Sequence, residues 1–256
     1  MTALAGRVAI VTRAGSDPGR AVALALAGAG ARVCCLDADD AAAKAAATAV
    51  ADAGGSADAY ATDTGNGAEI DAVVADIAAT EGRIDVLCTV AAEPGDGSLL
   101  EDVGTAEFDR LFRAGFKAAM LTCRAAGRVM TEAGHGSIIN VSSAIIDIPA
   151  ARTGAYAITA AAIDFLTKVL AREVGGQGVR VNAIAAGPAQ GFSPFTAARA
   201  DLAAAAYAGL PEPGPVLTHA GTPDDLGGLA VFLAGDESAS LTGQTIRLSG
   251  GWTMPW

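Results

Sequence analysis

The feature that most constrains the fold is an alternation of short apolar runs with longer helical patterns. Seven runs of strand length occupy residues 8–11, 32–36, 57–61, 84–90, 137–141, 179–184 and 245–248. The helical patterns between them begin near Gly19, Asp39, Asn66, Thr105, Thr153 and Pro223. Parallel strands need a crossover between them, and this order supplies one. We therefore predict an α/β fold with a doubly wound parallel sheet of about seven strands.

The chain shows no sign of a division into domains. No proline-, glycine- or serine-rich linker and no block of charge interrupts its 256 residues, so we expect one domain that covers residues 1–256. Pro211, Pro213 and Pro215 break the pattern after the sixth run, and residues 187–222 are expected to form a lid over the substrate. Ligands of open parallel sheets bind outside the carboxyl ends of the strands, which is where we look for chemistry.

The charge and hydropathy of the chain limit its partners. A formal net charge of −11 disfavours binding to the phosphates of nucleic acid or to an anionic membrane surface. Apolar residues make up 52% of the chain, but Gly, Asp and Arg interrupt them before a run approaches the roughly 18 residues of a membrane span. The first residues lead directly into a strand pattern, unlike a secretory leader. We expect a cytoplasmic protein that binds neither nucleic acid nor membrane.

The cysteines and histidines do not form a recognisable site. Cys34, Cys35, Cys88 and Cys123 lack the spacing of a metal site or a redox pair. Free cysteines usually pack as small apolar side chains, and we expect these four in the core. The two histidines stand beside glycines in expected turns, without an acid or nucleophile placed to complete a triad. No metal site is predicted.

Several motifs at the ends of the expected strands are similar to those of a known family. Ser142 and Ser143 close the fifth strand, and Tyr156 follows Ser143 by thirteen residues. The pattern continues at residues 180–182, 241–244 and 250–252. Over nearly its whole length the chain resembles the short-chain dehydrogenase/reductase family. The resemblance implies a single-domain Rossmann-like fold, a dinucleotide cofactor, and action of Ser143 and Tyr156 on an oxygen of a small substrate.

The resemblance also implies a set of cofactor-binding residues: Thr12, Gly19, Asp37, Asp63 and Ala91. Asp37 corresponds to the carboxylate that holds the adenosine ribose, and such a carboxylate disfavours the extra phosphate of NADP. Asp63 corresponds to the family's adenine contact. NAD(H) is therefore the candidate cofactor, although either aspartate can equally be a solvated loop acid.

The chain departs from the family pattern around the reacting atoms. Ala160 occupies the position of the lysine that lowers the pKa of the tyrosine, and Gly115 occupies that of an asparagine in the proton relay. A tyrosine with a pKa near 10 is only about one part in a thousand ionised at neutral pH. Tyr156 is then expected to be a poor base that can still donate a hydrogen bond.

The phosphate-binding loop departs from the family as well, because Arg13 and Asp17 replace two of its three glycines. A carboxylate about 4 Å from a phosphate oxygen costs about 4 kcal/mol at an effective dielectric constant near 20. Arg13 can neutralise Asp17 or bind a phosphate itself. The loop makes NAD(H) binding doubtful without excluding it.

Three interpretations of the function remain open. The favoured one is a non-redox or atypical enzyme that catalyses a dehydration, elimination, isomerisation or cyclisation of a small oxygenated molecule held by Ser143 and Tyr156. The second is an NAD(H)-dependent alcohol dehydrogenase or ketoreductase with weakened catalysis. The third is a noncatalytic subunit that completes a hetero-oligomer with an active relative.

Further charged residues and two helix faces complete the expectations. Glu93 and Asp147 can act as acid or base in the substrate cleft, or remain loop charges. Arg152 can bind an anionic group of the substrate or remain solvated.

Alanine-rich faces follow Thr105 and Thr153, on the two helices with which relatives dimerise. We expect a homodimer or homotetramer.

Overall fold

The computed structural model describes residues 3–90, 95–148, 151–187, 216–217 and 222–254. These residues form one seven-stranded sheet in the order β3-β2-β1-β4-β5-β6-β7, in which every neighbouring pair is parallel. The strands are β1 (Val8–Thr12), β2 (Arg32–Asp37), β3 (Ser56–Ala61), β4 (Val86–Val90), β5 (Gly136–Ser143), β6 (Val179–Ala186) and β7 (Thr245–Leu248). The predicted doubly wound parallel sheet is confirmed.

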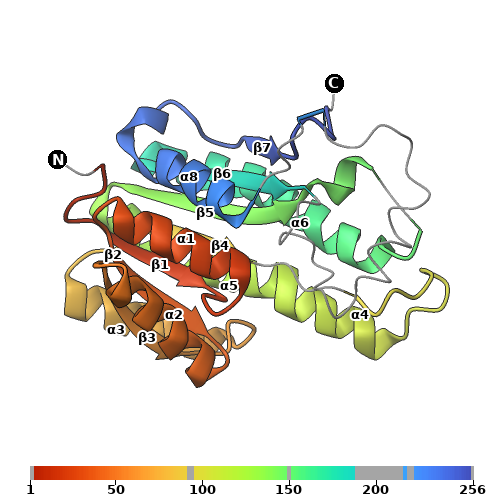
Figure 1. Cartoon of the computed structure of the whole chain (residues 1–256), viewed down its shortest axis with the longest axis horizontal. Coiled ribbons are helices and arrows are strands. Elements are labelled where there is room, and N and C mark those ends of the chain that lie inside the picture. The colour runs from red at the N-terminus through yellow and green to blue at the C-terminus, as the bar shows by residue number, and fades with distance from the viewer. Residues whose placement is uncertain (1–2, 91–94, 149–150, 188–215, 218–221, 255–256) are drawn as a thin grey trace.

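Helices cover both faces of this sheet (Figure 1). One layer consists of α1 (Asp17–Gly28), α2 (Asp40–Asp52) and α8 (Pro223–Ala234). The other consists of α3 (Gly67–Glu81), α5 (Ala118–Ala133) and α6 (Gly154–Val174). α4 (Thr105–Phe112) leads into α5 through one π-helical turn, η1 (Arg113–Lys117). The predicted helix starts agree with the observed ones within two residues.

Side chains at the N-termini explain where several helices begin. Ser16, Asp39 and Asn66 each accept a hydrogen bond from a backbone N–H in the first turn of α1, α2 and α3. Thr222 and Asp225 form a reciprocal capping box at the start of α8. These bonds satisfy backbone donors that have no partner within the helix.

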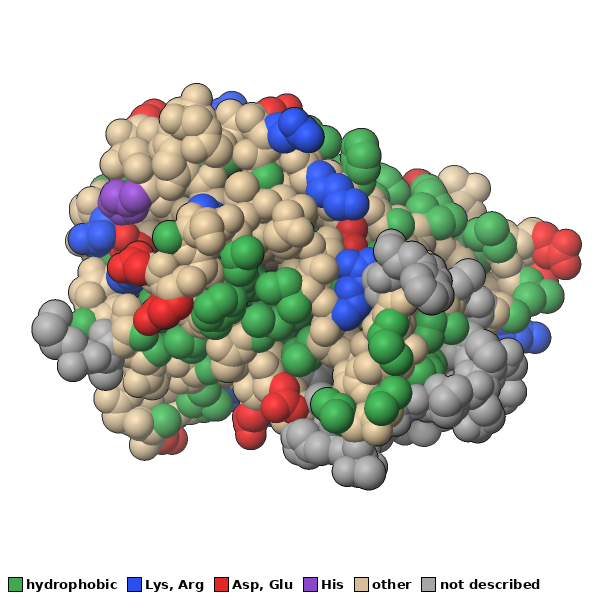
Figure 2. All heavy atoms as spheres, turned by 90° about the horizontal axis from the view of Figure 1, so that it is seen from above, with side chains coloured by type: hydrophobic (Ala, Val, Ile, Leu, Met, Phe, Trp, Pro, Cys, Tyr) green, Lys and Arg blue, Asp and Glu red, His purple; other side chains and the backbone are tan. Residues whose placement is uncertain are grey.

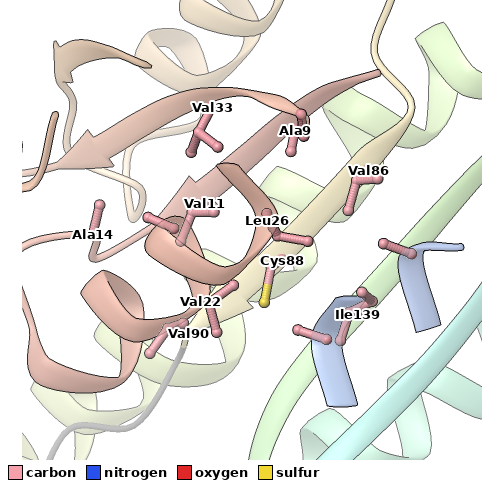
Figure 3. Packing of buried hydrophobic residues seen from close by; sticks show 14 of the residues in the cluster. Ala9, Val11, Ala14, Val22, Leu26, Val33, Val86, Cys88, Val90 and Ile139 are labelled. Carbon is pink, nitrogen blue, oxygen red and sulfur yellow. The ribbon is translucent and has the colours of Figure 1, made fainter. Parts of the chain in front are cut away.

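Both faces of the sheet carry an apolar core. Successive residues of a strand point to opposite faces, so Val33 and Cys35 of β2 join the cluster beneath α1 and α8, whereas Cys34 and Leu36 join the cluster beneath α3 and α5. Figure 3 shows the first cluster, where Leu26 of α1 lies among side chains of the central strands. This arrangement explains why the central strands β1 and β4 are buried along their whole length, whereas the edge strands β3 and β7 are only partly buried.

The four cysteines are free and buried. Burial raises the pKa of each thiol to about 12, so the reactive thiolate is scarce at neutral pH. The prediction that they pack in the core is confirmed.

One helix is more apolar than the sequence pattern suggested. Residues Gly154–Gln177, which include α6, are long and apolar enough to cross a membrane by length and composition alone. Yet 44% of the apolar window is buried inside the protein, where α6 packs against β5 and β6. Core helices of globular proteins pass the same test, so this helix is weak support for a membrane span.

A buried polar cluster joins β4, β5, α5 and α6 at the centre of the molecule. The Asn140 amide oxygen accepts hydrogen bonds from Thr89 Oγ1 at 2.8 Å and Cys123 Sγ at 3.2 Å. The Asn140 amide nitrogen donates to Thr167 Oγ1 at 2.9 Å. Asn140 is fully buried, so water cannot reach its amide group in the folded chain. These three hydrogen bonds satisfy the amide in place of water.

Replacement of this amide tests its contribution to the fold. Asn140→Ala leaves the hydroxyl of Thr89 without its acceptor and opens a cavity, so we expect a loss of about 2–4 kcal/mol in the free energy of unfolding. Chemical denaturation measures it. Asn66→Ala, which removes the exposed N-cap of α3 and its bond to Glu69, is the control and should cost about 1 kcal/mol. Equal losses in the two variants would contradict this account.

Candidate cofactor and substrate site

The loop after β1 keeps a tight turn despite its altered residues. Arg13 has a φ of 50°, in the left-handed region that glycine usually occupies. The Gly19 N–H donates to Ser16 Oγ at 3.2 Å, and a Cβ added at Gly19 would lie 2.1 Å from the Arg13 carbonyl oxygen. The backbone of this loop therefore follows a path that excludes any side chain at Gly19.

Asp17 has a different partner from the one suggested by the sequence. Its carboxylate bonds to Arg20 at 2.6 Å, one turn later on α1, so the suggested neutralisation by Arg13 is replaced by an i,i+3 pair. Both side chains of this pair are exposed. Asp17 also begins α1, where a negative charge is favoured by the helix dipole. The start of α1 is therefore a position at which the charge of Asp17 stabilises the helix.

Asp37 is fixed at the carboxyl end of β2. One carboxylate oxygen accepts the Gly15 N–H at 3.0 Å and the other accepts the Asp39 N–H at 3.1 Å. Each carboxylate oxygen has capacity for a further donor, so Asp37 can still bind the hydroxyls of a ribose.

A cavity of about 450 Å³ lies beside Asp37, at the ends of β1, β2 and β3. Asp63 lines it, accepts the Gly65 N–H at 2.9 Å, and forms an ion pair with Arg113 of the π-helical turn. The sequence reasoning did not select Arg113. Its position two residues before Gly115, on the helix that borders the site, was the signal that could have found it.

The remaining predicted cofactor residues have different outcomes. Thr12 is buried, and its hydroxyl accepts a hydrogen bond from the Val90 N–H at 2.9 Å. This bond links β1 to β4. Ala91 and Glu93 lie outside the described residues. Most of the predicted lid, residues 187–222, also lies outside them.

The predicted catalytic pair is placed by β5 and α6. Ser143 is the last residue of β5, and its hydroxyl accepts the Ile145 N–H at 3.3 Å at the start of the 3₁₀ turn η2 (Ala144–Asp147). Tyr156 lies in the first turn of α6, which packs against η2. Both side chains are buried, with 6% and 5% of their surface exposed. Ala160, also buried, follows one turn later on the same face of α6.

Two of the three charged residues predicted near the substrate are engaged elsewhere. Asp147 forms a two-bond ion pair with Arg247 of β7, at 2.8 and 2.9 Å. Asp147 is therefore held as a partner of Arg247, whose pKa it raises. Arg152 has a φ of 69° and donates to the Gly97 carbonyl oxygen at 3.1 Å.

A further carboxylate lies under the site. Asp164 follows Ala160 by one turn of α6, and it accepts a hydrogen bond from Ser142 Oγ at 2.5 Å. Burial raises the pKa of Asp164 in spite of this bond. The spacing of Tyr156, Ala160 and Asp164 at every fourth residue was the signal that could have identified it.

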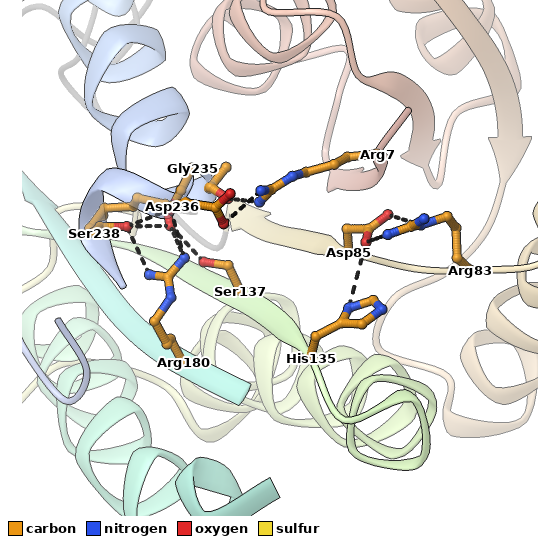
Figure 4. Close-up of polar contacts among 11 residues, drawn as sticks. Arg7, Arg83, Asp85, His135, Ser137, Arg180, Gly235, Asp236 and Ser238 are labelled. Atoms are coloured by element: carbon orange, nitrogen blue, oxygen red, sulfur yellow. Dashed lines mark hydrogen bonds and ion pairs between the residues drawn. The ribbon is translucent and has the colours of Figure 1, made fainter. Parts of the chain in front are cut away.

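The opposite end of the sheet, at the amino ends of its central strands, carries a charged network of structural character (Figure 4). Arg180 donates to the Leu233 and Gly235 carbonyl oxygens at the end of α8, at 2.9 and 3.1 Å. Arg83 bonds to Asp85 at 2.5 Å, and His135 lies 3.6 Å from the same carboxylate. Figure 2 shows a histidine beside basic and acidic side chains on the surface. Among the described residues no cluster of three or more His, Cys, Asp or Glu side chains is placed to hold a metal.

The fold and the cavity beside Asp37 are of the kind found in dinucleotide-binding α/β proteins, and comparison with known proteins identifies the family. Residues 18–253 match the family described as enoyl-(acyl carrier protein) reductase. D-threitol dehydrogenase of Mycolicibacterium smegmatis is 33% identical over 98% of this chain and 94% of its own length. The chain belongs to the short-chain dehydrogenase/reductase family.

Solved structures agree with this assignment. A protein of Beutenbergia cavernae, described as an NAD(P)-dependent gluconate 5-dehydrogenase with NADP bound at low occupancy, is 35% identical with a TM-score of 0.87 over 98% of both chains. An NAD⁺-bound xylitol dehydrogenase is 26% identical with a TM-score of 0.85, over 97% of this chain and 99% of its own. These names favour oxidoreductase chemistry over the non-redox reaction favoured by the sequence reasoning.

Substitution of Gly19 tests the loop geometry. Gly19→Ala forces the Arg13 carbonyl to move, so we expect a loss of roughly 1–3 kcal/mol in the free energy of unfolding. Gly28→Ala, at the other end of α1, is the matched control because nothing lies within 4 Å of its added Cβ. We expect that control to be neutral or stabilising by up to about 1 kcal/mol. Thermal and denaturant unfolding of both variants check this, and a neutral Gly19→Ala would refute the tight turn.

Proposed function

We propose that the protein is an NAD(H)-dependent oxidoreductase that interconverts a secondary alcohol and a ketone. The observation that carries the proposal is the cavity of about 450 Å³ bordered by Asp37 at the end of β2, next to the tight Arg13–Gly19 turn. The residues around it fit the adenosine half of a dinucleotide. The Asp37 carboxylate favours ribose hydroxyls and repels a phosphate in their place, so NAD(H) is preferred over NADP(H).

A small polyol or sugar acid is the proposed substrate class. The relatives named for D-threitol, xylitol and gluconate support it, since each of these molecules carries several hydroxyl groups. Ser143 and Tyr156 offer two hydroxyls at the end of β5 and the start of α6. In this proposal both hydroxyls bind the reacting oxygen of the substrate. Tyr156 accepts the proton of that oxygen during oxidation and returns it during reduction.

The departures from the family pattern set the expected rate. When bound, NAD⁺ accepts the hydride removed from the alcohol carbon. Ala160 provides no cation one turn beyond Tyr156, so nothing at that position favours the ionised tyrosine that accepts the proton. We therefore propose slow oxidation at neutral pH.

A non-redox reaction is the second candidate, and the same two positions favour it. With Ala160 and Gly115 in place of the lysine and asparagine expected from the family, Ser143 and Tyr156 are retained without the partners that hydride-transfer chemistry uses. The pair can still bind an oxygen during an elimination or isomerisation.

Cofactor titration tests the first proposal. We expect calorimetry to show NAD⁺ binding at least tenfold more tightly than NADP⁺, because Asp37 repels the additional phosphate. Asp37→Asn should reduce this ratio by removing the charge while keeping an acceptor. Absence of binding by both cofactors at millimolar concentration would overturn the proposal.

Restoration of the cation tests the origin of the slow rate. We expect Ala160→Lys to raise kcat/KM for NAD⁺-dependent oxidation of a polyol at least tenfold, because a cation near Tyr156 stabilises its ionised form. Ala161→Lys, on the exposed side of α6, is the matched control and should leave the rate unchanged. Steady-state kinetics with D-threitol and xylitol measure this effect. An Ala160→Lys protein that binds NAD⁺ without a gain in rate would favour the non-redox candidate.

A further inference from the structure

Arg113 lines the same cavity as Asp37. It is the first residue of the π-helical turn between α4 and α5, and its side chain is about half exposed. The same wall includes Asp63, Thr64, Gly65 and Ala114. The π-helical turn between α4 and α5 therefore contributes a cation to the cavity beside Asp37.

The ion pair with Asp63 holds the guanidinium in one place. Asp63 is itself fixed, because one of its carboxylate oxygens accepts the Gly65 N–H at 2.9 Å and its own N–H donates to Glu69 Oε2 at 3.0 Å. Arg113 bonds to the other carboxylate oxygen. The guanidinium is thus anchored before any ligand arrives.

Gly65 shows how the guanidinium is oriented. A Cβ added at Gly65 would lie 3.0 Å from Arg113 Cγ and 3.2 Å from both Cζ and Nε. These are the three nearest atoms, so both terminal nitrogens lie farther away, and a face of the planar group, not its edge, lies over Gly65. Any residue larger than glycine there would displace it. Arg113 and Gly65 both line the cavity, so this planar group forms part of its wall.

A planar, half-exposed cation in a cavity wall is suited to stack on an aromatic ring. We propose that Arg113 is the platform on which the adenine base of the nucleotide stacks, an inference that rests on the proposed NAD(H) function and extends it. The base lies between Arg113 and the end of β2, with its ribose directed to Asp37. Asp63 retains lone pairs that accept the exocyclic amine of adenine, so this arrangement rejects hypoxanthine, which carries an oxygen in its place.

ADP-ribose is the probe that isolates this half of the site, since it lacks nicotinamide. We expect calorimetry to show that Arg113→Ala binds ADP-ribose about tenfold more weakly than the unaltered protein. Arg113→Lys keeps the charge beside Asp63 but loses the plane, and it should lose most of the same affinity. Arg124→Ala is the matched control, because Arg124 also forms an exposed ion pair, with Asp71, but does not line the cavity.

The outcomes separate this inference from the proposed function. Nicotinamide hypoxanthine dinucleotide should bind more weakly than NAD⁺ to the unaltered protein. Unchanged ADP-ribose affinity in Arg113→Ala and Arg113→Lys would overturn the platform while leaving the NAD(H) function intact. No binding of NAD⁺ or ADP-ribose to the unaltered protein would overturn both. An equal loss of ADP-ribose affinity in Arg113→Ala and Arg124→Ala would also overturn the platform. So would a fall in the melting temperature of Arg113→Ala large enough to show that the variant is partly unfolded.

Discussion

The structure depends on the pairing of β1 with β2 on one side and β4 on the other. The chain leaves β1 in one direction to build β2 and β3, and returns to the other side of β1 to build β4 through β7. This reversal places α1 and α3 on opposite faces and separates the loops at the carboxyl ends of β1 and β4. The Thr12 hydroxyl bonds the two strands where they part. The cavity beside Asp37 and the hydroxyl pair of Ser143 and Tyr156 both lie at this end of the sheet.

Much of the fold was predictable because its causes are local. Apolar runs of strand length mark the parallel strands, and Asp39, Asn66 and Thr222 are residues that cap helices by themselves. The ion pairs were less accessible. Asp147 and Arg247 are 100 residues apart in sequence, and no local pattern predicts that η2 and β7 bring them together. Asp17 illustrates the converse, since its partner one turn along α1 is a local feature that was overlooked.

The site was predictable only in part, and through resemblance more than through physical pattern. Ser143, Tyr156 and Asp37 could be named from motif and spacing, and the structure places each at the carboxyl end of a strand or the first turn of a helix. The choice between hydride transfer and other chemistry could not be made from these residues. Ala160 and Gly115 favour one answer, whereas the relatives favour the other. Arg113 was missed because its role depends on Asp63 and Gly65, which only the tertiary fold brings to it.

The backbone of Arg13 has a consequence for how this loop can change. A residue with a side chain is about 1 kcal/mol less stable than glycine in the left-handed region, yet Arg13 adopts it. Two neighbours hold it there, because Gly19 packs against its carbonyl and Ala14 donates to the Leu36 carbonyl at 3.1 Å. The path of the loop is thus imposed by the scaffold. Its residues can alter the charge offered to a ligand while the shape of the turn stays the same.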